Sequence, residues 1–190
     1  MVRQLMRPLI LASSSPRRQF LMKEAGFQFK VDSPDIDESF PSDMDLKLVP
    51  KFLAENKAKV FADKIKDEIV ITADTVVILN KKILNKPQDR LEAISMLTEL
   101  SEKTHLVITA VCLFSKEKID TFDDHTEVTF KKLSQEEIEF YIDTWKPFDK
   151  AGAYGAQDWL GMVGIEKING SYFTVMGMPM HKVYSHLMSF

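Results

Sequence analysis

The sequence lacks most features that mark secreted or membrane-bound proteins. Its one cysteine, Cys112, lies within the apolar run 106–114, so we expect a buried small hydrophobe rather than a nucleophile or half of a disulfide. No apolar stretch reaches the ~18–20 residues that cross a bilayer, and no separate hydrophobic signal region stands at the N-terminus. These absences predict a cytoplasmic protein with no membrane partner.

The chain also lacks an excess of charge of one sign. Lys and Arg number 25 and Asp and Glu number 28, giving a formal net charge of −3, which argues against non-specific binding to nucleic acid. Neither a Walker loop nor a Rossmann glycine pattern is present. The histidines lack the spacing of a zinc site and are expected to be structural or solvent-facing: His105, His125, His181 and His186. With no repeat or Gly/Ser linker, residues 1–190 are expected to form one domain.

Hydrophobic periodicity predicts alternating helices and strands, with mixed strand directions in an α/β fold. The expected strands are 8–12, 68–79, 105–114 and a strand that follows a turn at 116–118 and ends near 132. The expected helices are 16–26, 51–66, one opened by residues 87–89, and one from Ser134 to about Trp145 that begins with a Ser134/Glu137 capping box. Glycines after position 147 predict tight turns and short strands.

The turn 13–15 leads into a helix whose first turn is doubly positive. Ser15 is the expected N-cap and Pro16 fits the first helical position. Arg17 and Arg18 then add positive charge where the helix dipole is already positive, which costs a few tenths of a kcal/mol or more each unless an anion sits there. A bound phosphate would remove this conflict. The alternative is that both arginines point to solvent or to surface carboxylates.

Two acidic features are candidates for binding a cation. An acidic loop, 32–45, includes Glu38, which we select as the carboxylate that reaches Mg²⁺, because Mg²⁺ takes one or two protein carboxylates and otherwise waters and phosphates. Asp74 interrupts an apolar strand, and burying it without a partner would cost several kcal/mol. Asp74 therefore belongs to a structural ion pair, or it binds a cation and activates water beside a phosphoryl group.

Three further residues complete the candidate set. Lys57 lies on an Ala-rich helix and Lys86 precedes a helix start; each is a surface lysine or one of several cations that converge on a triphosphate. The loop 149–157 is rich in small residues and ends in Gln157, whose amide both donates and accepts. Such an amide is able to read the edge of a base.

Taken together, these segments resemble the Maf family of nucleoside triphosphate pyrophosphatases. The matches run in order from Leu11 to Pro179. They comprise Ser13–Arg18, Asp37-Glu38, Leu53–Ala58, Ala73–Val77, Lys86-Pro87 and Ala151–Gln157. Each motif is modest by itself, and the set is specific.

The resemblance implies a fold and an oligomeric state. It implies a Maf/ITPase-like architecture, in which a mixed, elongated central β-sheet is flanked by helices and two lobes surround a central cleft. It also makes a homodimer plausible, for which Met and aromatic residues near the C-terminus are candidate interface residues. They are equally candidates for the core: Met176, Met178, Met180 and Phe190.

The resemblance also implies a reaction, hydrolysis of the bond between the α and β phosphates. Mg²⁺ or Mn²⁺ would be held by Glu38 and Asp74, and Asp74 would accept the proton of the attacking water. The residues implied to bind phosphates are Arg18, Lys57, Lys86, Ser13 and Ser15. Arg17, Thr75 and Gln157 match the branch of the family that hydrolyses dTTP and UTP, whereas the branch acting on 7-methyl-GTP carries Tyr, Gln and Glu at those places.

Two readings of the biological role stay open at this point. The first is an enzyme that hydrolyses dTTP and UTP, or modified pyrimidine nucleotides, and thereby prevents the incorporation of modified nucleotides. The second is a nucleotide-binding regulator of cell division and septum formation with little turnover, because the family resemblance also implies a link to arrest of division. Production of a monophosphate and pyrophosphate from dTTP would distinguish them.

Overall fold

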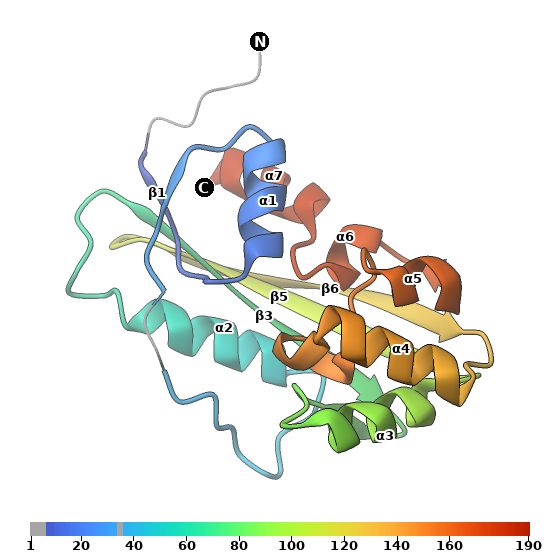
Figure 1. The fold of residues 1–190 in the computed structure, drawn as a ribbon. Helices are drawn as coiled ribbons and strands as arrows, with labels where there is room; N and C mark the ends of the chain where they lie inside the picture. The colour runs from blue at the N-terminus through green and yellow to red at the C-terminus, as the bar shows by residue number, and fades with distance from the viewer. Residues whose placement is uncertain (1–6, 34–35) are drawn as a thin grey trace. The chain divides into compact units, whose positions relative to one another are not determined.

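The computed structural model describes residues 7–33 and 36–190, and it forms an α/β fold, as the sequence predicts (Figure 1). The strands are β1 (Leu9–Leu11), β2 (Phe29–Val31), β3 (Ile69–Leu79), β4 (Lys82–Leu84), β5 (Thr104–Phe114), β6 (Ile119–Phe130) and β7 (Ile165–Asn169). The helices are α1 (Pro16–Glu24), α2 (Val49–Lys59), α3 (Arg90–Leu100), α4 (Gln135–Trp145), α5 (Trp159–Gly164), α6 (Tyr172–Val175) and α7 (Met180–Ser189). None of the described helices is long and apolar enough to span a bilayer.

The strands form one mixed sheet in the order β2-β1-β3-β5-β6-β7, with β4 paired to β3. β1 is parallel to both β2 and β3, whereas β3–β4 and β6–β7 are antiparallel. The parallel pairs are joined by helical crossovers and the antiparallel pair β3–β4 by a tight turn. The mixed strand directions expected from the sequence are therefore confirmed.

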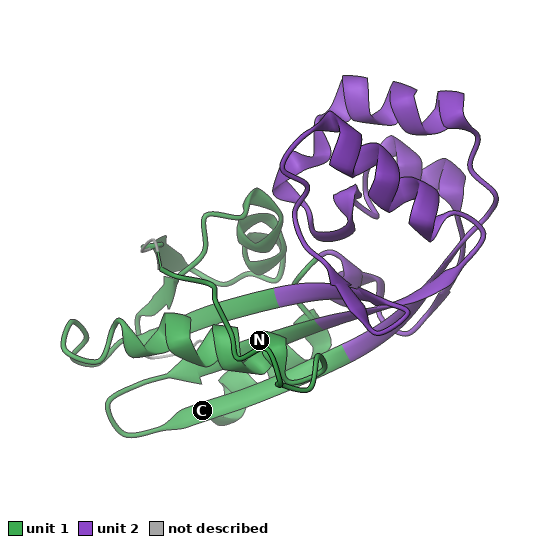
Figure 2. Ribbon diagram, turned by 90° about the horizontal axis from the view of Figure 1, so that it is seen from below, with its two compact units in different colours: residues 1–74, 109–124, 177–190 green, residues 75–108, 125–176 purple. Residues whose placement is uncertain are grey.

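The chain divides into two compact units, shown in green and purple in Figure 2. Unit 1 comprises residues 1–74, 109–124 and 177–190, of which residues 1–6 and 34–35 lie outside the described part. Unit 2 comprises residues 75–108 and 125–176. The strands β3, β5 and β6 each contribute residues to both units, so the division falls within continuous strands. The arrangement of two lobes around a cleft stays a prediction.

In unit 1, helix α2 packs through small residues. Ala54 and Ala58 are fully buried and cluster with Ala110 and Cys112 of β5, so the helix backbone comes close to the strands. The Thr72 hydroxyl donates to the carbonyl of Ala54 at 2.6 Å. Burial raises the pKa of Cys112 to about 11, which keeps the thiol protonated and confirms the expected small hydrophobe.

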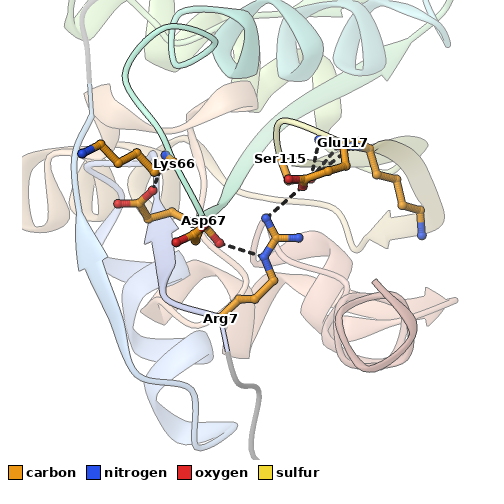
Figure 3. A network of polar contacts seen from close by, with 7 residues as sticks. Arg7, Lys66, Asp67, Ser115 and Glu117 are labelled. Carbon is orange, nitrogen blue, oxygen red and sulfur yellow. Dashed lines mark hydrogen bonds and ion pairs between the residues drawn. The ribbon is translucent and has the colours of Figure 1, made fainter.

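The turn between β5 and β6 is tied to the start of β1 by one arginine (Figure 3). Arg7 donates through Nε to the carbonyl of Asp67 at 2.7 Å and through Nη2 to Glu117 Oε2 at 3.1 Å. The Ser115 hydroxyl donates to the same carboxylate oxygen at 2.9 Å and accepts from the N–H of Lys118. These bonds close the turn that the sequence places at 116–118.

In unit 2, the helices α3 and α4 are joined by an ion-pair fork. Arg90 donates through Nε and Nη2 to the two carboxylate oxygens of Asp143, at 2.8 and 2.9 Å. At the start of α4 the Ser134 hydroxyl accepts from the N–H of Glu137, and the Glu137 side chain accepts from the N–H of Ser134. The capping box predicted from the sequence is therefore confirmed.

Helix α2 is shorter than the predicted helix 51–66, since it ends at Lys59. Residues beyond it form turns, one of them closed by a hydrogen bond from the N–H of Ile65 to the carbonyl of Phe61 at 3.2 Å, and Phe61 and Ile65 are buried in a cluster with Ala12 and Val70. The apolar spacing therefore marks buried positions beyond the end of the regular helix.

Two other expectations need correction. β4 is absent from the sequence prediction, because its hairpin turn uses Asn80 and Lys81 at positive φ rather than a glycine. From Pro147 onward the chain contains two 3₁₀ helices, Pro147–Asp149 and Ala151–Ala153, three α-helices and one short strand, so helices outnumber the expected short strands. No glycine follows Gly177, and Val183 and Leu187 are buried one turn apart in α7.

The buried histidine of unit 2 predicts a pH-dependent stability. His105 is 2% exposed, and burial lowers its pKa to about 4. The unfolded chain binds a proton at His105 below about pH 6.5, whereas the folded state does not. The free energy of unfolding therefore has its full value above that pH and falls by about 3 kcal/mol as the pH drops toward 4. Urea unfolding at several pH values should show this pH dependence of the free energy of unfolding in the wild type and a weaker one in His105→Gln. Equal pH dependences would contradict the role of His105.

Candidate active site

The turn before α1 is organised around the buried Ser13. Its hydroxyl accepts from the N–H of Ser15 at 3.3 Å, and its carbonyl accepts from Gln19 Nε2 at 3.2 Å. Ser15 occupies the N-cap position and Pro16 the first turn, as expected, but the Ser15 hydroxyl makes no capping bond. The first turn contains no acidic residue, and the carboxylates that act on Arg18, those of Asp74 and Glu38, come from other segments of the chain.

The two arginines of α1 have different environments. Arg18 donates through Nε to the carbonyl of Gly177 at 2.9 Å and through Nη1 to the carbonyl of Ala73 at 2.8 Å. Burial lowers the pKa of Arg18, and the nearby Asp74 carboxylate opposes this effect. Arg17 is half-buried and adds to the positive charge around Arg18. The Arg18 guanidinium is therefore fixed in orientation beside the strand that carries Asp74.

Lys57 joins the two acidic candidates. Its ammonium nitrogen lies 2.7 Å from Glu38 Oε1 and 2.6 Å from Asp74 Oδ1. The side chains of Lys57 and Asp74 are 15% and 11% exposed, whereas that of Glu38 is 48% exposed. One cation from α2 thus brings together carboxylates from a loop and from β3.

The local structure explains how Glu38 and Asp74 reach the same cation. The Asp37 carboxylate accepts from the N–H of Ser39 at 2.9 Å and from its hydroxyl at 2.7 Å, which folds the acidic loop around Glu38. These bonds lower the pKa of Asp37. Asp74 is placed by β3, whose first six residues, 69–74, are all buried.

The environment of Asp74 combines burial with positive charge. Burial raises the pKa of Asp74, while Lys57 and Arg18 act in the opposite direction and Glu38 adds to the rise. The ion pair that the sequence offered as the structural alternative is therefore present. A carboxylate in this setting is also suited to accept a proton, so the two readings are compatible.

The donor set fits one hard divalent cation. In the described residues, 7–33 and 36–190, no group of three or more His, Cys, Asp or Glu side chains has the geometry to hold a metal. Two carboxylates that share one ammonium do converge on a single point of positive charge. Mg²⁺ needs no more than this from a protein when substrate phosphates supply further oxygens.

The other three candidates lie in unit 2. Thr75 is half-buried in β3, Lys86 is exposed before α3, and Gln157 is half-buried in the loop before α5. The N–H of Gly152 donates to the carbonyl of Asn85 at 3.2 Å, so the segment of Lys86 is bonded to the loop that leads to Gln157. The remaining seven predicted residues, from Ser13 to Asp74, lie in unit 1.

The loop that carries Gln157 requires its glycines. Gly152 has φ +70°, and a Cβ there would lie 3.1 Å from a methyl group of Val77. A Cβ at Gly155 would lie 2.6 Å from Asp158 Oδ2.

Within the described chain, the buried Oε1 atom of Gln157 has no hydrogen-bond partner. A buried amide oxygen with no partner costs free energy, which a ligand N–H would recover.

Comparison with solved structures defines the fold class. The chain is similar to a HAM1 protein from Coxiella burnetii, with a TM-score of 0.56 at 14% identity, covering 97% of this chain and 100% of that one. It is also similar to the Ham1 protein of Staphylococcus aureus, with a TM-score of 0.51 at 11% identity and 96% and 99% coverage. The protein therefore has the fold of the Ham1 proteins.

Comparison of sequences defines the family. The model of the Maf-like proteins matches residues 8–190. The chain is 46% identical over 182 residues to a protein of Flavobacterium psychrophilum named dTTP/UTP pyrophosphatase, covering 95% of this chain and 93% of that one. Proteins of the same name from Bacteroides fragilis (46%; 94% of each chain) and Porphyromonas gingivalis (43%; 96% and 94%) are also similar. The chain belongs to the Maf family.

Sequence reasoning missed the residues that support the candidate site. Tyr141 bonds to both Gly155 and Asp158. Each pair joins residues 14 or more positions apart, so no local pattern reveals it. The signal available in the sequence was the presence of buried aromatic residues with polar tips, which need partners.

The bridging lysine predicts a large effect on stability. Lys57→Met leaves the Asp74 carboxylate buried without its closest cation, which should lower the free energy of unfolding by about 3 kcal/mol. Lys59→Met is the matched control, because Lys59 lies on the same helix, is exposed and bonds Asn56; it should cost less than about 0.5 kcal/mol. Urea unfolding measures both values. Similar losses in the two variants would show that the bridge does not stabilise the fold.

Proposed function

We propose that the chain hydrolyses dTTP and UTP to the nucleoside monophosphate and pyrophosphate. The observation that carries this proposal is the pair of carboxylates, Glu38 and Asp74, held at one cation in a chain similar to proteins named dTTP/UTP pyrophosphatase. The electropositive first turn of α1, also in unit 1, supplies the charge that a triphosphate requires. A regulator with little turnover is not proposed, because these relatives bear the name of an enzyme.

Glu38 and Asp74 are the proposed ligands of the divalent cation. When bound, Mg²⁺ or Mn²⁺ would neutralise phosphate charge and polarise the bond that breaks. Lys57 keeps both carboxylates in position by bonding an oxygen of each. As a flexible ammonium group, it is also able to turn toward a phosphate oxygen.

Asp74 is the proposed general base. Its burial favours the protonated form, so the carboxylate gains by accepting the proton of an attacking water. Arg18, fixed by the carbonyls of Gly177 and Ala73, presents positive charge beside it. Because the guanidinium is already oriented, it stabilises developing phosphate charge with little reorganisation.

Phosphate oxygens are proposed to bind at the turn 13–15. The Ser13 and Ser15 hydroxyls and the backbone N–H groups at the start of α1 are the donors. Lys86 is proposed as a further phosphate-binding residue. These roles follow the family motifs at the same positions.

Arg17, Thr75 and Gln157 are proposed to select the base. Thymine and uracil present an N–H between two carbonyl groups. The oxygen of a glutamine amide is able to accept from this N–H, and its NH₂ group is able to donate to one of the two carbonyl oxygens. The buried Oε1 of Gln157, which has no partner among the described residues, supports this pairing.

A cytoplasmic location and a homodimer are part of the same proposal. Met176 and Met178 are both buried, so they are assigned to the core rather than to the dimer interface.

The test of the proposal compares rates for several nucleotides. With Mg²⁺, kcat/KM for dTTP and UTP should exceed that for GTP by at least about tenfold, because a site built to bond one base edge leaves polar groups unpaired with another. Asp74→Asn should lower kcat for dTTP by about 100-fold or more while the protein stays folded. Equal rates for all nucleotides, or a folded Asp74→Asn variant with wild-type kcat, would contradict the proposed roles.

A further inference from the structure

A single tyrosine hydroxyl bonds to both ends of the turn that carries Gln157. Residues 155–158 form a four-residue turn, closed by a hydrogen bond from the N–H of Asp158 to the carbonyl of Gly155 at 3.1 Å. The Tyr141 hydroxyl donates to Asp158 Oδ2 at 2.8 Å and accepts from the N–H of Gly155 at 3.1 Å. Gln157 is the third residue of this turn and lies between the two bonded residues.

The side chains around the turn leave it little room to move. Asp158 stands at the N-cap of α5, yet its carboxylate makes no capping bond and is directed to Tyr141. The same carboxylate lies over Gly155, where even a Cβ would come within 2.6 Å of it. On the other side, Gly161 of α5 lies so close to the carbonyl of Ala156 that no larger residue fits.

Tyr141 is well placed to hold the turn. It is fully buried in α4, and its ring stacks on that of Trp145 at 5.8 Å between centroids. Burial and the neighbouring Asp158 carboxylate raise the pKa of Tyr141, so the hydroxyl stays protonated and keeps donating. Lys150 Nζ lies 3.6 Å from the same carboxylate oxygen, which balances its charge.

We propose that Tyr141 and Asp158 are positioning residues that hold Gln157 where its amide meets the pyrimidine edge. The inference rests on the proposed function of Gln157 and adds the means by which a loop residue acquires a fixed place. Both ends of the turn are fixed by hydrogen bonds to Tyr141, and Gln157 Oε1 has no partner among the described residues. Because Tyr141 is fully buried, its proposed effect on the base is exerted through Gln157.

The experiment is a double-mutant cycle measured with UTP as substrate. Tyr141→Phe should raise KM for UTP about tenfold and leave kcat within about twofold, because a displaced Gln157 weakens binding of the base but not the chemistry. In the Gln157→Ala background, Tyr141→Phe should have no further effect on KM. Independent, multiplying effects in the double variant, or a loss of kcat with KM unchanged, would overturn the proposal.

Two controls separate positioning from general damage to the loop. Tyr154→Phe removes another buried hydroxyl of the same loop, the one bonded to His105, and should leave KM for UTP within about twofold. Asp158→Ala should reproduce the effect of Tyr141→Phe, and Asp158→Asn, which keeps an acceptor for the tyrosine, should restore most of it. A Tyr154→Phe variant with the same rise in KM would overturn the specific role of Tyr141.

Hydrogen exchange provides a readout that does not depend on turnover. Tyr141→Phe should speed exchange of the amide protons of residues 155–158 by about tenfold or more, and Tyr154→Phe should not. Unchanged exchange in Tyr141→Phe would overturn the positioning role even in an active enzyme. If Tyr141→Phe speeds this exchange but the wild-type protein turns over no UTP, the proposed function is wrong while the hold of Tyr141 on the turn stands.

Discussion

The ammonium group of Lys57, shared between Glu38 and Asp74, is the interaction on which the candidate site depends. Glu38 belongs to an exposed loop and Asp74 to a buried strand, and neither would be held near the other without the cation between them. Two carboxylates close together repel, and a buried carboxylate without a partner is costly. The lysine opposes both penalties and brings one oxygen of each carboxylate to a single point.

The same constraint explains the surroundings of the pair. Arg18 reaches the carbonyl of Ala73, one residue before Asp74, so the positive first turn of α1 is fixed beside the strand that carries the carboxylate. The small residues of α2 bring its backbone close to the strands, which lets Lys57 extend to Asp74. In unit 2 a different principle operates, since two ends of one turn are fixed by a neutral tyrosine hydroxyl.

Elements governed by local rules were predictable from the sequence. The capping box at Ser134 and the strand that contains Asp74 follow from short-range patterns, and both are confirmed. The end of α2 at Lys59 was not predictable, because the apolar spacing continues through Phe61 and Ile65, which are buried in the turns that follow the helix. For the site, the residue types indicated the chemistry, and the family motifs indicated which residues belong to the site. The sharing of Lys57 and the bonds of Tyr141 depend on contacts between distant segments, which only the fold reveals.

The proposed reaction is tested most directly by the identity of the products formed from dTTP. Phosphorus NMR of the wild-type protein with dTTP and Mg²⁺ distinguishes cleavage between the α and β phosphates from cleavage between the β and γ phosphates. The proposed hydrolysis gives dTMP and pyrophosphate in equal amounts, with no dTDP. Formation of dTDP and orthophosphate, or binding of dTTP without any product, would contradict the proposed reaction.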